Sequence, residues 1–327
     1  MRLIALAVAV SCLLAAAATE AQQAGKIYRI GVLETRNATL NAANIEAFRR
    51  GLRELGYKDG QSFELVYRSS DGRNERFPAL AGELVDLKVD LILTRGTPAA
   101  LAAKNATRTT TIPVVMASSG DPVGAGLVTS LGRPGGNVTG LSNYNVEIYA
   151  KRVELLKELL PRLTRIAGLF NMGNPVLPIQ WNVAERAARA LGMHPQLLDT
   201  RRPEDLARAF DTATKEHAEA MVVALDGVTQ ANLPLIAELA AKHRLPAIFA
   251  TSEYVDVGGL MSYGASDPQL YHRAAAYVDK IFKGANPGNL PIEQPTKFEL
   301  AVNVKTAKAL GLTIPPTLLQ RADQVVT

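Results

Sequence analysis

The sequence Ile112-Pro-Val-Val-Met-Ala-Ser-Ser119 has a counterpart in Leu245-Pro-Ala-Ile-Phe-Ala-Thr-Ser252. In both copies an apolar run ends in hydroxyl residues and leads into a loop that contains glycines and ends in leucine. The openings of the two halves also agree, because Arg29-Ile-Gly-Val-Leu33 lies 136 residues (165 minus 29) before Arg165-Ile-Ala-Gly-Leu169. A solenoid unit repeats every 20 to 50 residues, so this longer duplication predicts two similar lobes with a cleft between them.

Short apolar runs alternate with amphipathic stretches in each half of the chain. This alternation is typical of parallel sheets covered by helices. We therefore predict an α/β fold of two doubly wound, Rossmann-like lobes with parallel sheets. The expected strands are 28–33, 63–67, 91–94, 114–116, 165–170, 195–198, 221–224 and 247–249, and the expected helices are 43–55, 76–86, 98–106, 178–191, 203–216 and 233–242.

The amino terminus reads as a secretory signal peptide over residues 1–21. Arg2 precedes an apolar run from Leu3 to Ala18, and small residues up to Ala21 offer a cleavage site. The run is shorter than the roughly 20 residues that span a bilayer. We expect a periplasmic protein cleaved near Ala21, with a lipid anchor on Cys12 as the less favoured alternative.

The two lobes are expected to share several crossings of the chain. The turn cluster before residue 138, the strand over 260–263 and a strand over 298–302 each mark one crossing. We predict that lobe 1 comprises residues 26–141 plus about 264–296. Lobe 2 would then comprise residues 142–263 plus about 297–327, joined to lobe 1 by a multi-strand hinge.

Composition and motifs argue against several classes of function. The net charge of +5 is dispersed rather than gathered into a stripe, which disfavours nucleic acid as a partner. Cys12 is the single cysteine and would leave with the signal peptide, so disulfides and thiolate metal sites are not expected. No hydrolase, metalloprotease or phosphate-loop motif is present, and no histidine follows a strand. We predict no catalytic residues, no cofactor and no metal site.

Candidate ligand-binding residues follow the strands, because ligands of open α/β sheets bind beyond the carboxyl ends of the strands. Thr97 before Pro98 suggests a helix N-cap that points N–H groups at the cleft, and Asp226 is the preferred partner for an amino group. Each candidate has a purely structural alternative, such as capping its own helix or turn. The candidates from the first half are Glu34, Arg95, Thr97, Ser118, Ser119 and Asp121, and those from the second half are Asn171, Asp226 and Tyr254.

Four blocks of the sequence resemble one family. They are Thr97-Pro-Ala-Ala100, Asp121-Pro-Val-Gly124, Arg133-Pro-Gly-Gly-Asn-Val-Thr-Gly140 and Asn303-x-x-x-Ala307-x-x-Leu-Gly311. The chain from about residue 27 to 325 is similar to ABC-transporter substrate-binding proteins, a family that includes tryptophan- and phenylalanine-binding members. The resemblance implies a type I periplasmic binding fold that closes on a small molecule and delivers it to a membrane permease.

The resemblance also implies roles for individual residues. Relatives hold an amino acid by its carboxylate and ammonium ends, which by position implicates Thr97, Ser118, Ser119, Asn143 and Asp226. Arg95 departs from the small residue of many relatives, and its guanidinium would favour an additional anionic group on the ligand.

The expected function is that of a monomeric solute-binding protein of an ABC importer, with an amino acid or an organic acid as ligand. Two alternatives stay open at this point. The chain could be an exported ligand-sensing module for a membrane receptor, or a secreted hydrolase with an unrecognised site.

Overall fold

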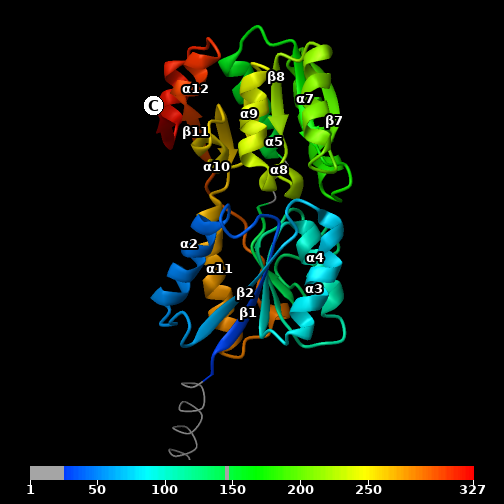
Figure 1. Cartoon of the computed structure of the whole chain (residues 1–327), viewed down its shortest axis with the longest axis vertical. Coiled ribbons are helices and arrows are strands. Elements are labelled where there is room, and N and C mark those ends of the chain that lie inside the picture. Colours follow the sequence, from blue (N-terminus) through cyan, green and yellow to red (C-terminus); the bar gives the residue numbers. More distant parts are fainter. Residues whose placement is uncertain (1–25, 144–146) are drawn as a thin grey trace, which may run out of the picture.

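The computed structural model describes residues 26–143 and 147–327 of the chain, so the predicted signal peptide lies outside the described residues. Two α/β lobes stand end to end, with the amino-terminal half below and most of the carboxyl-terminal half above (Figure 1). No helix among the described residues is long and apolar enough to cross a membrane.

Lobe 1 is built on a parallel five-stranded sheet. The strand order is β2 (Phe63–Ser69), β1 (Tyr28–Glu34), β3 (Leu91–Arg95), β4 (Val114–Ser118) and β5 (Val138–Gly140). Two apolar clusters fill the spaces between the sheet and its helices. The associated helices are α2 (Ala42–Glu54), α3 (Phe77–Asp86), α4 (Thr97–Ala106) and α11 (Asp267–Phe282), with short 3-10 turns at Asn74–Arg76 and Pro287–Asn289.

Lobe 2 is built on a seven-stranded sheet. The strand order is β12 (Gln324–Val326), β11 (Glu299–Asn303), β10 (Met261–Gly264), β9 (Ala247–Phe249), β8 (Ala220–Val223), β6 (Arg165–Phe170) and β7 (His194–Asp199). Its helices are α5 (Glu147–Leu159), α6 (Leu177–Ala190), α7 (Asp205–Lys215), α8 (Gly227–Ala231), α9 (Leu233–Lys242), α10 (Glu253–Asp256), α12 (Val304–Ala309) and α13 (Pro316–Arg321). The predicted fold class is confirmed, since both sheets are dominated by parallel pairs.

One strand of lobe 2 departs from the parallel order, because β11 runs antiparallel to β10. The path of the chain explains the difference. After β10 the chain leaves the sheet to form α11, which packs against α2 in lobe 1 (Figure 1). It returns to lobe 2 from the same side, so β11 must begin beside the end of β10.

The chain passes between the lobes three times, after β5, after β10 and before β11. Two of these crossings pair with each other. Leu141 forms a parallel bridge with Glu293, and the Ser142 N–H donates to the Glu293 carbonyl oxygen at 2.9 Å. The crossing segments therefore form a short, hydrogen-bonded connection between the lobes.

Candidate ligand-binding cavity

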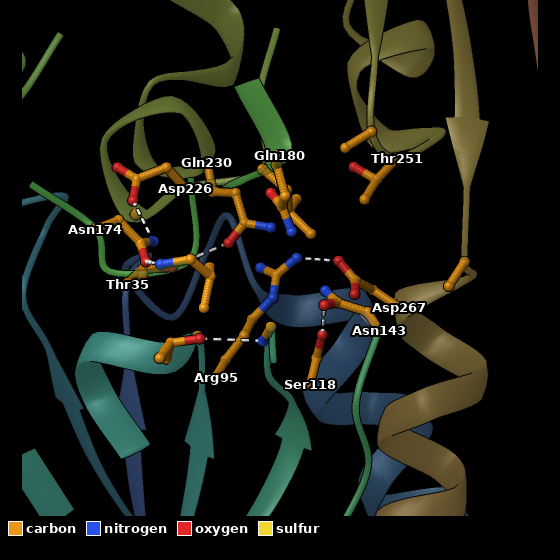
Figure 2. Close-up of a pocket in the computed structure, with 18 of the residues that line it drawn as sticks. Thr35, Arg95, Ser118, Asn143, Asn174, Gln180, Asp226, Gln230, Thr251 and Asp267 are labelled. Carbon is orange, nitrogen blue, oxygen red and sulfur yellow. Dashed lines mark hydrogen bonds and ion pairs between the residues drawn. The ribbon is translucent and has the colours of Figure 1, made fainter. Parts of the chain in front are cut away.

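A cavity lies between the carboxyl ends of the two sheets, and the space in it that is open to the centre of a water-sized sphere is about 50 Å³. Arg95 and Ser118 reach into it from lobe 1, whereas Asp226, Gln180 and Thr251 reach it from lobe 2 (Figure 2). The cavity therefore takes side chains from the ends of strands in both sheets, as expected for an open α/β sheet.

The floor of the cavity is the turn between β3 and α4. Gly96 has φ 86° and ψ 148° and is the N-cap of α4, whose first residues are Thr97 and Pro98. The prediction that Thr97 is the N-cap is therefore wrong by one residue. A positive φ suits glycine, and the Thr97 hydroxyl instead accepts a hydrogen bond from Gly120 N–H at 3.1 Å.

The hydroxyl groups after β4 are held by neighbouring loops. Asn143 Nδ2 donates to Ser118 Oγ at 2.8 Å, and Asn143 N–H donates to the Ser119 carbonyl oxygen at 2.8 Å. Ser119 Oγ lies 3.3 Å from Thr97 Oγ1. Thr97, Ser118 and Asn143 line the cavity, while Ser119 supports the floor without lining it.

The wall from lobe 2 contains Asp226, which is buried and caps the amino end of α8. Its Oδ1 accepts hydrogen bonds from Asn171 Nδ2 at 2.9 Å and from Val228 N–H at 3.0 Å. Its Oδ2 accepts one bond, from Asn174 Nδ2 at 2.9 Å. A carboxylate offers about four lone-pair sites, so Oδ2 keeps one acceptor position for another donor.

Arg95 is buried at the edge of the cavity in a network of charged side chains. Its Nη2 forms an ion pair with Asp267 and lies 3.9 Å from a carboxylate oxygen of Glu253. Burial acts against the charge of Arg95, but Asp267 and Glu253 outweigh it and hold the pKa of Arg95 above its usual value. Its positive charge is thus already compensated, which weakens the expectation that Arg95 selects an additional anion.

Glu34 also belongs to this network, and the pKa values of both Glu34 and Glu253 are shifted. Burial raises the pKa of Glu34 to about 7, against the opposing effect of Arg95 and Arg36. Burial also opposes ionisation of Glu253, but Arg36 and Arg95 lower the pKa of that carboxyl to about 2. Arg36 Nη2 reaches Glu253 Oε1 at 3.1 Å, so this ion pair joins lobe 1 to α10 of lobe 2.

A second buried arginine, Arg152, lines the cavity from α5. Its side chain is 3% exposed; Nε donates to the Tyr263 carbonyl oxygen at 2.8 Å, and the guanidinium lies 4.5 Å from the centre of the Tyr149 ring. Burial lowers the pKa of Arg152, and no carboxylate of the described residues lies within 4 Å of it. Arg152 was not among the residues predicted from the sequence.

Not every predicted residue faces the cavity. Asn171 stands behind Asp226, and Glu34 lies buried in the Arg95 network. Asp121 Oδ1 accepts from Val123 and Gly124 N–H, so it caps its own turn. Tyr254 is 1% exposed and stacks on Phe249 in the core, because α10 directs its ring toward the apolar side. The lining residues that were not predicted include Tyr149, Arg152, Asn174, Gln180, Gln230, Thr251 and Asp267.

The lobes meet closely around the cavity. A Cβ on Gly120 of lobe 1 would lie 2.8 Å from Val176 Cγ2 of lobe 2, which is too close for a real contact. Thr35 Oγ1 also donates to Gln230 Oε1 across the same boundary at 3.4 Å. Within residues 26–143 and 147–327, no three His, Cys, Asp or Glu side chains gather closely enough to hold a metal ion.

Three known proteins are similar to this chain over most of its length. The tyrosine-binding protein of Clostridioides difficile (strain R20291) is 28% identical over 268 residues, which are 82% of this chain and 76% of that protein. The ABC domain in complex with L-Trp from Streptococcus pneumoniae has a TM-score of 0.83 and 28% identity, and the match covers 92% of this chain and all of that one. The ligand-free, open structure of a substrate binding protein with adhesive properties from Clostridium difficile has a TM-score of 0.64 and 25% identity over the same shares.

These relatives are solute-binding proteins and not enzymes, which removes the hydrolase alternative. A family model described as ABC transporter substrate binding protein matches residues 32–326, almost the whole described chain. The chain therefore belongs to the family of ABC transporter substrate binding proteins.

Proposed function

We propose that this protein captures an amino acid in the cavity between its lobes, outside the cytoplasm, and delivers it to an ABC permease for import. The observation that carries the proposal is the cavity itself, which combines a carboxylate with a free acceptor position on Asp226 and hydroxyls on Thr97 and Ser118. Relatives named as tyrosine-binding and as bound to L-Trp support an amino acid as the ligand class.

The arrangement of the lobes supports capture by closure. The structure is more similar to the Trp-bound relative, at a TM-score of 0.83, than to the ligand-free, open relative, at 0.64, although their identities to this chain are 28% and 25%. Close contacts such as Gly120 against Val176 are those of a closed cleft. Hinge closure around a ligand is the usual motion of two-lobed binding proteins.

The cavity is lined by amide and hydroxyl side chains beside apolar ones such as Ile148, Val176 and Leu225. Among the described residues that line it, Tyr149 is the single aromatic, whereas Asn174, Gln180, Gln230 and Thr251 supply amide and hydroxyl groups. We therefore expect the ligand side chain to be small or able to form hydrogen bonds.

Thermal unfolding of the purified protein against the twenty L-amino acids, aromatic acids and dicarboxylates tests the binding function. A ligand at about 100 times its Kd adds roughly 2.7 kcal/mol of stability, which raises Tm by about 2–4 °C for a chain of this size. Asp226→Asn should remove the shift for amino acids. Stabilisation by none of these compounds would contradict the proposal.

Uptake by intact cells tests the transport step. Cells that lack this chain should lose uptake of the stabilising amino acid, and the wild-type chain should restore it whereas the Asp226→Asn variant should not. The mature protein recovered from the cells should begin near Gln22 if residues 1–21 are a cleaved signal peptide. Unchanged uptake together with a lost cellular response to the ligand would instead indicate a sensing module.

A further inference from the structure

Arg152 is a buried cation whose charge the described part of the protein leaves uncompensated. Its Nη1 is buried and has no hydrogen-bond partner among the described residues. Among the described residues, Nε donates to the uncharged backbone carbonyl of Tyr263, and the guanidinium lies over the aromatic ring of Tyr149. A guanidinium stays protonated in proteins, so the cavity wall carries a full positive charge.

Arg95 lines the same cavity and provides an internal comparison. Asp267 and Glu253 lie within 4 Å of it, so its charge is met by two carboxylates. Arg152 has no such neighbour among the described residues, although its exposed fraction of 3% is similar to the 1% of Arg95. Burial of an unpaired charge is strongly unfavourable unless a partner arrives.

The surroundings of Arg152 connect it to the residue expected to hold an amino group. The Leu225 N–H donates to the Tyr149 hydroxyl at 3.3 Å, and Leu225 directly precedes Asp226. One tyrosine side chain thus stands between the guanidinium and the segment that carries the carboxylate. The same wall of lobe 2 presents a cation and an anion to the cavity.

We propose that Arg152, whose side chain lines the cavity, is the residue that binds the carboxylate of the ligand. The proposal rests on the proposed amino-acid-binding function and assigns one end of the ligand within it. The planar fork of a guanidinium matches a carboxylate, and it supplies a positive charge, which the neutral Ser118 and Thr97 hydroxyls of the same cavity do not have. A ligand carboxylate at Arg152 supplies the negative charge that the wall lacks.

The test compares a ligand with its own amide. The amino acid that stabilises the wild-type protein most is titrated by calorimetry beside its carboxamide, which keeps the ammonium group and the side chain but loses the negative charge. The variants are Arg152→Gln, Arg152→Lys and Lys151→Gln. Lys151 is the adjacent residue of α5, lies outside the cavity lining and is half-exposed, so its substitution removes the same charge from outside the site.

We expect Arg152→Gln to weaken binding of the amino acid roughly 100-fold, the effect of losing a charged hydrogen-bonded pair in a buried site. Binding of the amide should change little, and Lys151→Gln should leave both affinities as they are. Arg152→Lys keeps the charge without the fork and should recover part of the loss. Without ligand, the Tm of Arg152→Gln should not fall, because the substitution removes an uncompensated buried charge.

Equal weakening of amino acid and amide by Arg152→Gln would show a structural role and overturn the proposal, as would unchanged binding of the amino acid. If Arg152→Gln does not fold, the Arg152→Lys variant decides. If the guanidinium binds the ligand carboxylate, this substitution should weaken binding of the amino acid more than binding of its amide. If no compound with a carboxylate binds the wild-type protein, the proposed function fails together with the role of Arg152. If the wild-type protein binds an amino acid but Arg152→Gln does not weaken that binding, only the role of Arg152 fails.

Discussion

Asp267 and Glu253 are the carboxylates that allow Arg95 and Arg36 to be buried at the edge of the cavity. The cost of burying each guanidinium is met only while its partner is ionised. At the scale of single residues, the site is therefore as much a set of internal ion pairs as a set of ligand contacts.

Asp267→Asn should be strongly destabilising, by about 3 kcal/mol, because it leaves Arg95 buried with a weaker counter-charge. Urea unfolding measures this as a lower midpoint. Asp59→Asn is the matched control, since Asp59 pairs with Arg49 at 2.8 Å on the surface and such pairs contribute less than about 1 kcal/mol. Equal effects of the two substitutions would contradict the role of Asp267.

Glu34 gives the stability of the protein a specific pH dependence. Its pKa of about 7 in the folded protein exceeds the usual value of 4.5, so between these pH values the folded state holds a proton that the unfolded state has lost. The free energy of unfolding should therefore fall as pH rises through this window, by on the order of 3 kcal/mol.

The comparison of wild type with Glu34→Gln isolates this effect, because the other titrating groups are common to both proteins. Chemical unfolding at pH 5, 6, 7 and 8 should show the wild type losing stability relative to Glu34→Gln. A constant difference across the series would mean that Glu34 does not titrate in this range.

At the scale of elements, periodicity predicted most strands and helices to within a few residues, because their apolar faces repeat along the chain. It could not predict the direction of β11, which depends on where α11 packs. It also could not predict the direction of the Tyr254 side chain, because α10 follows a loop whose path the periodicity does not indicate. Arg152 did leave a signal, since it interrupts the buried face of α5 between Ile148 and Leu156, and a charge on an apolar face needs a partner.

The junction of β4 and α4 depends on one hydroxyl. Thr97→Val keeps the shape of the side chain but removes the acceptor for Gly120 N–H, so it should cost roughly 1–3 kcal/mol of stability. Thr97→Ser keeps the hydroxyl and should retain most of the stability. Thermal unfolding distinguishes them, and equal losses would show that the methyl group matters rather than the hydrogen bond.

At the scale of the whole molecule, the duplication predicted two lobes, but it could not predict how they fit together. Which loops meet across the cleft depends on how far the hinge closes, and a sequence carries no direct signal of that angle. The contact of Gly120 with Val176 depends on this closure, because the two residues lie in different lobes and nothing in the sequence around either one indicates the other.

Gly120→Ala should hinder closure, because the new Cβ would lie 2.8 Å from Val176 Cγ2 and the branched valine side chain has little freedom to turn away. We expect ligand affinity to fall about tenfold, a free-energy change of about 1.4 kcal/mol. The double variant Gly120→Ala/Val176→Ala should recover part of it, because the new Cβ would still lie 3.0 Å from Thr97 Oγ1. Gly82→Ala is the control, since a Cβ at Gly82 meets nothing within 4 Å.

Calorimetry with the stabilising amino acid measures these affinities, and small-angle scattering shows whether the ligand still makes the variant more compact. A Gly120→Ala protein that binds and closes like the wild type would mean that the lobes do not meet this tightly in solution.

The return of the chain to lobe 1 as α11 also determines when each lobe can fold during synthesis. Tyr271, Ala274 and Val278 of that helix complete a core that begins with Ile30 and Phe48, so the amino-terminal lobe cannot finish folding until residues 267–282 have been synthesised. Lobe 2 likewise waits for β11 and β12 at the end of the chain. Contacts this distant in sequence slow folding. A growing chain with this connectivity stays open to a translocation channel or a chaperone for nearly its whole synthesis.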